Sequence, residues 1–329
     1  MNILYTINNG FVPQVGAGIC SVCENNLQSE KIRFFIVSAG ISEDNKEELT
    51  KLVVKYKREI EIIELPDLKT FFDFEFDTLG WNPIVLARLL VDKLLPNDVD
   101  RVLYLDGDTI VRGDLSELWG LNMHGKTIGM SIEPTIGQQM KRDLNLIDYP
   151  YHNAGVLLID LKRWRETNAG KIIIDFYREN DGKLLGNDQD AINVSMKDEI
   201  YVISPKYNFY NIFYQYSYRF LCKLMNPVKY ISEEVYQNAI KDPVIIHYLG
   251  EERPWREGNT HKYKNDYWKY LNMTYWKDTP EEKGWKLYFV CWRIFNVITK
   301  PFPGIRHAII FFLIPYILKY RARIIKKGK

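Results

Sequence analysis

The stretch Arg101-Val-Leu-Tyr-Leu-Asp106-Gly-Asp108 decides the fold, because an apolar run ends here in two carboxylates separated by one residue. The run predicts a buried β-strand, and Asp and Gly favour a turn at its carboxyl end. Two hard anionic oxygens on such a turn can hold Mg²⁺ or Mn²⁺ against a diphosphate. A plain turn without a ligand is the alternative, so the motif needs support from elsewhere in the chain.

The residues before this stretch alternate between β-rich and amphipathic segments. Strands are predicted at residues 2–7, 32–38 and 60–65, with helices at 15–26 and 42–56 between them. This βαβαβ order predicts an α/β fold, a mostly parallel, Rossmann-like sheet flanked by helices. In such folds a ligand binds at the carboxyl ends of the strands, where the two carboxylates would lie.

The residues after the stretch continue the same pattern until about residue 255. We expect a helix at 83–94 just before the stretch, and after it a helix at 162–179 and strands at 154–159 and 244–247. Prolines, aromatics and lysines then replace the alternation. We therefore predict a catalytic domain over residues 1–256 and a C-terminal helical region over residues 257–329.

The predicted strand at 244–247 ends in a second group of polar residues, within Val244-Ile-Ile-His247-Tyr-Leu-Gly250-Glu-Glu-Arg253-Pro-Trp255. His247 could complete a metal site begun by carboxylates, although a lone histidine at a strand end is more often a packed core residue. Gly250 would let a backbone N–H approach a phosphate, and Arg253 could bind a diphosphate with two hydrogen bonds.

Two further segments carry polar residues suited to a sugar. In His152-Asn153-Ala154-Gly155, the Asn153 amide can bind hydroxyls and the small residues leave room beside it. Residues 186–190, Gly-Asn-Asp-Gln-Asp, place an amide between two acids at a predicted helix start. An ordinary turn and an ordinary helix cap are the alternatives for these two segments.

Taken in order along residues 1–256, these motifs resemble glycosyltransferase family 8, which includes bacterial lipopolysaccharide glucosyl- and galactosyltransferases and glycogenin. The resemblance implies a GT-A fold that binds a UDP-hexose across the sheet. It implies Mn²⁺, with Mg²⁺ possible, held by Asp106, Asp108 and His247. The implied donor-binding residues are Arg88, Asp106, Gly107, Asp108, Asn153, Ala154, Asp188, Gly250 and Arg253, and the chain's own residues add Asn8 and Phe11 as candidates for the base.

The resemblance also implies a retaining reaction, with Gln189 beside the anomeric carbon and Asp188 on the hexose hydroxyls. Gln189 is an amide and a poor nucleophile, and Asp188 is competent but occupied. We therefore favour front-face attack over a covalent intermediate. The chain departs from the family at Arg253, where lysine is usual, and at the end of the first strand. There Asn8 can still pair with uracil N3–H, and Phe11 can stack on the ring.

Charge divides the chain unevenly. Eleven of the 44 Lys and Arg residues lie in residues 283–329, which contain no acidic residue, so residues 1–282 hold 42 acidic and 33 basic side chains. An acidic body with a basic tail argues against a nucleic-acid partner and favours an anionic membrane surface. The apolar run at 308–318 has about 11 residues, short of the ~20 that a spanning helix needs. We expect an interfacial helix, with a helical hairpin packed on the body as the alternative.

The four cysteines are too few and too scattered for a disulfide framework, and the N-terminus reads as a strand rather than a signal peptide. We expect a cytoplasmic protein, peripheral on the inner face of the membrane. The expected activity transfers glucose or galactose from a UDP-sugar to a glycan or glycolipid acceptor of lipopolysaccharide or capsule type. A self-glucosylating enzyme like glycogenin and a non-catalytic nucleotide-sugar-binding protein are the alternatives. A hydrolase or nucleotidyltransferase is disfavoured because no Gly-rich phosphate loop is present.

Overall fold

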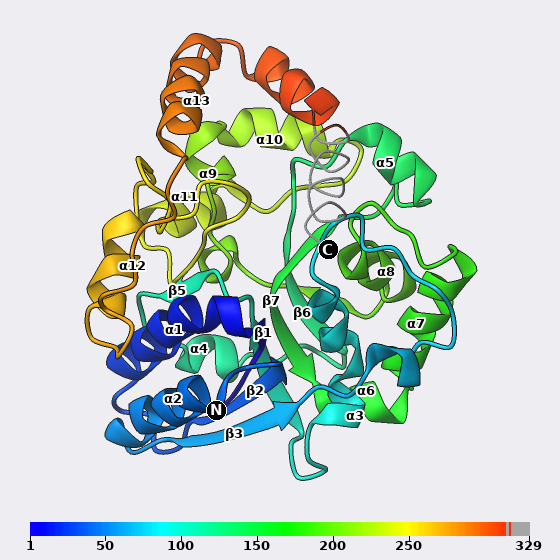
Figure 1. The fold of residues 1–329 in the computed structure, drawn as a ribbon. Coiled ribbons are helices and arrows are strands. Elements are labelled where there is room, and N and C mark those ends of the chain that lie inside the picture. Colours follow the sequence, from blue (N-terminus) through cyan, green and yellow to red (C-terminus); the bar gives the residue numbers. More distant parts are fainter. Residues whose placement is uncertain (314–315, 317–329) are drawn as a thin grey trace.

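A computed structural model describes residues 1–313 and 316, and a seven-stranded sheet with the order β3-β2-β1-β4-β7-β6-β8 forms its centre (Figure 1). Only β7 runs against its neighbours, since it pairs antiparallel with both β4 and β6 while every other pair is parallel. The mostly parallel sheet is therefore confirmed. The strands are β1 (Asn2–Asn8), β2 (Arg33–Ala39), β3 (Glu59–Glu64), β4 (Arg101–Leu105), β6 (Ile128–Ile132), β7 (His152–Asp160) and β8 (Ile200–Val202).

The predicted βαβαβ unit is present, with α1 (Val12–Asn25) and α2 (Glu43–Lys55) between its strands. Ser42 caps α2, because its side chain accepts a hydrogen bond from the Asn45 N–H, and two acidic residues occupy the first turn. One apolar core lies on each face of the sheet, one of them including Leu4, Tyr104 and Leu157 and the other Tyr5, Leu103 and Leu158. Alternate residues of the same strands thus face opposite cores.

Two predicted helices are interrupted. Residues 83–94 form a 3₁₀ helix, Pro83–Leu90, followed by α3 (Val91–Leu94). Contacts outside the helix account for this, since Arg88 is held by the Ala154 carbonyl and the Asp106 carboxylate. Residues 162–179 are divided into α6 (Leu161–Glu166) and α7 (Ala169–Glu179) by Asn168, whose φ of 53° is left-handed. Asparagine tolerates this conformation better than most residues, so it allows the chain to turn here.

The strand predicted at 244–247 does not join the main sheet. It is β9 (Ile245–His247), which pairs antiparallel with β5 (Thr109–Val111) in a separate two-stranded sheet. Since β5 follows the Asp-Gly-Asp turn directly, the pairing of Thr109 with His247 carries the imidazole to that turn. A separate core beneath this small sheet includes Ile110, Ile246 and Tyr267.

The remaining helices lie around the central sheet (Figure 1). They are α4 (Ser116–Trp119), α5 (Gln138–Asp143), α8 (Asp188–Ser195), α9 (Ile212–Gln215), α10 (Tyr218–Met225), α11 (Glu233–Lys241), α12 (Lys264–Leu271) and α13 (Lys286–Thr299), with short 3₁₀ helices at Asn9–Phe11, Leu68–Thr70 and Pro205–Tyr207. Residues 303–313 are also helical.

The C-terminal region begins inside the body and ends on its surface. The helix α12 packs into the body, because its Tyr267, Tyr270 and Leu271 are buried in the same core as Ala17 and Cys20 of α1. The domain boundary near residue 256 stays a prediction. In α13 only Phe289 and Thr299 are buried. Over the described part of the chain, no helix combines the length and apolarity needed to span a bilayer. The rest of the predicted apolar run and the last six basic residues lie outside the described residues.

Candidate active site

A cavity of about 800 Å³ opens at the carboxyl ends of β1 and β4. Every residue predicted for the donor, the metal or catalysis lines it, so strands and loops far apart in the sequence meet here. Cavities of this size suit a small molecule. The predicted residues in its lining are Asn8, Phe11, Arg88, Asp106, Gly107, Asp108, Asn153, Ala154, Asp188, Gln189, His247, Gly250 and Arg253.

Three side chains in the cavity could hold a metal ion. His247 Nε2 lies 3.4 Å from an Asp108 carboxylate oxygen and 3.7 Å from one of Asp106. All three ligand atoms lie within 4.8 Å of one another. Two carboxylates and an imidazole suit Mn²⁺ or Mg²⁺ together with oxygens from a diphosphate. The residues present therefore fit the predicted divalent cation.

The charges of this group support metal binding. Burial alone would raise the pKa of Asp108, but the hydrogen bond from His247 and the charges of His247 and Arg253 hold that pKa well below its usual value. The same contact raises the pKa of His247 against the effect of its burial. The carboxylate is thus ionised at neutral pH, and a cation would replace the proton of the imidazole.

A glycine makes room for this histidine. A Cβ atom at Gly155 on β7 would lie 2.2 Å from His247 Cε1, closer than any real contact of that kind. Gly107 is confined in a similar way, because a Cβ there would meet Phe11 Cδ1 at 3.0 Å. The glycines predicted near the site thus make space for its side chains.

Asn208 orients His247 from behind. Its Oδ1 atom lies 2.9 Å from His247 Nδ1 and accepts the imidazole N–H, which leaves Nε2 directed at the two carboxylates. Asn208 Nδ2 donates to Asn153 Oδ1, and Asn153 Nδ2 donates to Glu133 Oε2 at 3.3 Å. A directional chain of hydrogen bonds therefore joins the predicted sugar-binding amide to the predicted metal ligand.

Arg88 binds both carboxylates on the other side of the cavity. Its Nη2 lies 2.9 Å from Asp106 Oδ1, and its Nε lies 3.1 Å from Asp188 Oδ2. The guanidinium also covers the Tyr104 ring, whose hydroxyl donates to Asp106. Burial raises the pKa of Asp188 to about 6, although the charge of Arg88 opposes the shift.

Gln189 lies at the start of α8, where its side chain is fixed at both ends. Its Oε1 accepts the Ala154 N–H at 2.8 Å, and its Nε2 donates to the Tyr151 hydroxyl at 3.2 Å. The same hydroxyl donates to Asp190, which also accepts the Gly186 N–H at 2.7 Å. The amide is therefore held rigidly at the cavity wall.

The end of β1 and the loop after β9 form the remaining wall. Asn8 Oδ1 is buried without a hydrogen-bond partner among the described residues, so it is an acceptor available to a ligand. Arg253 Nη2 lies 3.1 Å from Asp108 Oδ2, and its guanidinium covers the Phe11 ring. Gly250 has a φ of 77°, a conformation that favours glycine.

Sequence reasoning missed Glu133 and Asn208. Glu133 directly follows the strand Ile128–Ile132, so its place at a strand end is the signal that it shares with Asp106, but no second carboxylate stands two residues further on. Asn208 lies between aromatic residues with no motif around it, and only the folded chain shows its contact with His247.

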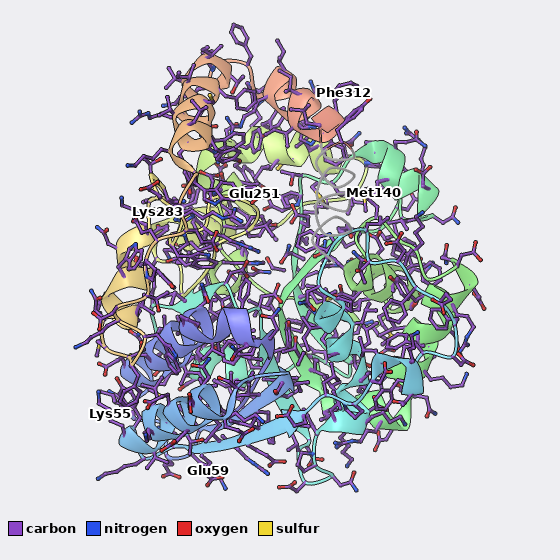
Figure 2. All side chains as sticks on the ribbon, in the orientation of Figure 1. Lys55, Glu59, Met140, Glu251, Lys283 and Phe312 are labelled. Carbon is purple, nitrogen blue, oxygen red and sulfur yellow. The ribbon has the colours of Figure 1, made fainter. Side chains whose placement is uncertain are left out.

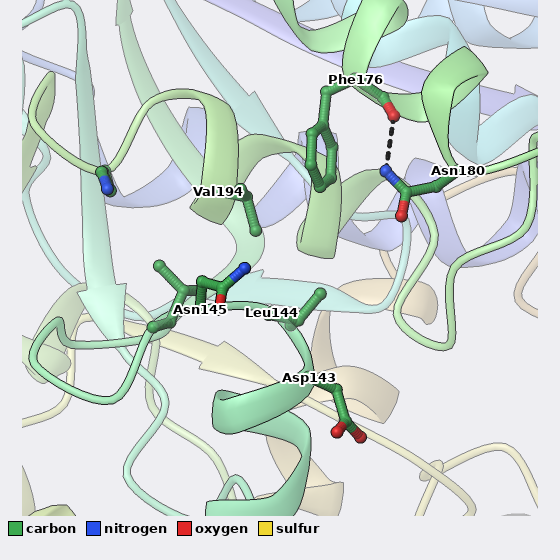
Figure 3. Close-up of a pocket in the computed structure, with 8 residues that line it drawn as sticks. Asp143, Leu144, Asn145, Phe176, Asn180 and Val194 are labelled. Carbon is green, nitrogen blue, oxygen red and sulfur yellow. Dashed lines mark hydrogen bonds between the residues drawn. The ribbon is translucent and has the colours of Figure 1, made fainter.

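A second, smaller hollow of about 150 Å³ lies at the end of α5 (Figure 3). It is lined by Asp143, Leu144, Asn145, Leu146, Phe176, Asn180, Val194 and Lys197. It shares no residue with the large cavity, and the Asn180 amide on its rim is already bonded to the Phe176 carbonyl. The chemistry therefore belongs to the large cavity.

Comparison with known proteins gives a consistent result. The model of glycosyl transferase family 8 matches residues 2–259. General stress protein A of Bacillus subtilis is 25% identical over 280 residues, 84% of this chain and 94% of that protein. Lipopolysaccharide 1,2-glucosyltransferase of Escherichia coli K12 is 25% identical over 87% of this chain and 79% of its own. The galactosyltransferase LgtC, solved with donor and acceptor sugar analogues, superposes with a TM-score of 0.70 at 23% identity, covering 87% of this chain and 99% of LgtC.

Proposed function

Since the chain belongs to glycosyltransferase family 8, we propose that it is a metal-dependent, retaining hexosyltransferase. The donor would be UDP-glucose or UDP-galactose, and the acceptor a glycan or glycolipid. The observation that supports this most is the convergence of Asp106, Asp108 and His247 beside Arg253 in one cavity. Groups suited to a metal ion, to a phosphate and to sugar hydroxyls thus lie in one cavity, which is what hexosyl transfer from a nucleotide sugar would require.

The nucleotide would bind at the end of β1. Asn8 Oδ1, buried and without a partner among the described residues, can accept the uracil N3–H, and the Phe11 ring lines the cavity beside Arg253, where it could contact the base. A bound divalent cation would neutralise charge on the diphosphate. Arg253 would add a second positive group on the leaving phosphate, and Gly250 would let the backbone approach it.

The hexose would lie against α8 and β7. Asp188, held by Arg88, can accept hydrogen bonds from sugar hydroxyls, and Asn153 can take part from the facing strand. Gln189 is placed in the same wall with its amide fixed. We infer that these residues orient the anomeric carbon toward the open part of the cavity.

Retention of the configuration at the anomeric carbon would follow from attack by the acceptor on the same face that the diphosphate leaves. Gln189 is an amide whose Oε1 already accepts the Ala154 N–H, so it is a poor nucleophile. Asp188 is paired in charge with Arg88, and the sugar hydroxyls would occupy its Oδ2, which accepts no hydrogen bond among the described residues. The C1–O bond to the diphosphate breaks, the acceptor oxygen bonds to C1 on the same face, and the acceptor proton passes to the departing phosphate oxygen. Asp188 and Asn153 would hold the sugar while positive charge develops at C1.

Membrane association would come from the C-terminal region. Five apolar residues of α13 recur at helical spacing and are exposed, and the neighbouring Arg293 and Lys300 are exposed as well. The five are Leu287, Val290, Ile294, Val297 and Ile298. An apolar stripe with cations fits the interface of an anionic bilayer, and the proposed location is the cytoplasmic face of a membrane. Val297→Asp should weaken sedimentation with anionic vesicles, whereas Leu27→Asp, at a similarly exposed apolar residue on the body, should not.

Release of UDP from a panel of sugar nucleotides, with Mn²⁺ or EDTA, tests the activity. Metal-dependent release from UDP-glucose or UDP-galactose that is lost in Asp108→Ala, but kept in the exposed Asp44→Ala, would support the proposal. Binding of a UDP-sugar without turnover would indicate a binding protein instead. A hexose added to the protein itself, detected by intact mass, would indicate self-glycosylation.

A further inference from the structure

The helix at residues 303–313 lies against one wall of the catalytic cavity. His307 Nε2 is 2.9 Å from the Thr135 carbonyl, and the Phe311 ring covers Gly137, where a Cβ atom would lie 2.5 Å from Phe311 Cε1. Phe311 also packs in a small apolar cluster with Ile136 and Met140. These three apolar side chains line the cavity, so the tail supplies part of its wall.

The other side of the same helix is exposed and apolar. We call four residues of this helix, together with Tyr316 just beyond it, the outer stripe; their spacing of four, three, one and three corresponds to one helical face. Between 37% and 67% of each side chain is exposed, and Phe312 points away from the body (Figure 2). The outer stripe consists of Ile305, Ile309, Phe312, Leu313 and Tyr316.

The helix is held firmly to the rest of the protein. Arg306 is buried at 3% exposure and its guanidinium covers the rings of Trp292 and Phe295 in α13. The helix α13 is tied in turn to the loop of the predicted phosphate ligands, since Arg256 covers the Trp285 ring at 3.6 Å. The outer stripe therefore has a fixed position relative to the cavity.

We propose that helix 303–313 is the acceptor wall, and that the acceptor is a glycolipid anchored in the bilayer that covers the outer stripe. The proposal rests on the function proposed above and names its acceptor class. One side of a single helix meets the catalytic cavity while the opposite side is apolar and solvent-exposed. A sugar whose lipid lies in that bilayer would enter the cavity along Phe311, because aromatic rings bind the C–H faces of sugars and apolar walls exclude water.

Two further features favour a glycolipid acceptor. No acidic residue lies between residues 283 and 329, so this segment of the chain carries no negative side chain that would repel anionic lipid. The rim of the cavity also exposes Leu185 and Leu249, which a wholly polar glycan would leave uncovered.

The orientation is tested with a fluorophore at two adjacent positions. Cys222 and Cys291, the two cysteines that are not buried, are first replaced by serine, and Phe311→Cys and Phe312→Cys are each labelled with an environment-sensitive dye. With vesicles of phosphatidylethanolamine and phosphatidylglycerol, the dye at position 312 should shift to shorter wavelength and be quenched by spin-labelled lipid. The dye at 311 should be shielded. Equal quenching at both positions, or none at 312, would overturn the proposal.

The acceptor class is tested with a radiolabelled UDP-hexose and two forms of one probe. Glycolipids extracted from the source organism are offered in the same vesicles, or after deacylation in water. Transfer should require the intact glycolipid, and Phe311→Ala should raise KM for it about tenfold with little change in KM for the donor. Equal transfer to the deacylated form, or donor hydrolysis without transfer to either, would overturn the acceptor proposal. Absence of donor turnover would instead count against the proposed function.

Discussion

Gly155 and His247 are in direct contact across the two sheets, and the absence of a side chain at 155 is what allows the imidazole to reach Asp106 and Asp108. Gly155→Ala should displace the ring and reduce Mn²⁺ affinity by about a hundredfold, as loss of a metal ligand's support does. Titration calorimetry measures this. Gly304→Ala, at a glycine with open space around it, is the control. Unaltered affinity in Gly155→Ala would mean that the ring moves without cost.

Asn208 should control metal affinity without touching the metal. Asn208→Ala removes the acceptor of the His247 Nδ1–H, so the imidazole can rotate or change tautomer. We expect Mn²⁺ affinity to fall between about tenfold and a hundredfold, measured by electron paramagnetic resonance of free Mn²⁺. Asn208→Asp keeps the acceptor and should restore most of the affinity. Equal losses in both variants would point to general damage to the fold.

Ionisation of Asp188 should set the acidic limb of the activity profile. Its pKa is raised to about 6, so the charged form is disfavoured in the folded protein, and this group adds stability as the pH falls through that value. Only the carboxylate can accept two sugar hydroxyls, so kcat/KM should fall about tenfold per unit below pH 6. A flat profile of kcat/KM between pH 5 and about 7 would exclude Asp188 from this role.

Arg253 should act through its charge and its position beside Asp108. Arg253→Ala should raise KM for the UDP-sugar and lower kcat, together costing about a hundredfold in kcat/KM, because the phosphate loses a charged partner. Arg253→Lys keeps the charge and should retain activity within about tenfold. Initial rates over a range of donor concentrations separate the two parameters. A lysine variant as weak as the alanine variant would show that the planar group is essential.

We expect Asn8 to recognise the base of the nucleotide through a hydrogen bond. Asn8→Leu removes the free acceptor and should weaken UDP binding about tenfold, while Asn8→Asp keeps an acceptor for uracil N3–H. Competition by UDP and by CDP, which lacks that N–H, provides the measurement. The wild-type preference for UDP should disappear in Asn8→Leu. Unchanged selectivity would move base recognition to another residue.

The sequence predicted the strands well because their apolar runs are strong and bounded by turn residues, as at β1, β2 and β4. It failed where contacts distant in sequence decide the local structure. The 3₁₀ winding around Arg88 goes with such contacts, to Ala154 and Asp106. The separate pairing of β9 with β5 has the same origin. The break at Asn168, in contrast, is a local left-handed turn that the helical pattern of the sequence does not reveal.

The site residues also divide into those that a local sequence motif reveals and those whose role depends on tertiary contacts. Most of the predicted residues lie in one of four local motifs, and all of the predicted residues line the cavity. Asn208 acts only through His247, and Phe311 through its position over Gly137, so neither has a local pattern to recognise. Their roles arise from tertiary structure, which a single sequence does not display.

The pairing of Thr109 with His247 also bears on how the protein is made. During synthesis, the two aspartates leave the ribosome long before the histidine that faces them. The main sheet can form all its described strands by Val202, but the cation site stays incomplete until β9 has emerged and paired with β5. Since pairing over such a long chain separation is slow, the nascent chain should be inactive as a transferase until translation is nearly finished.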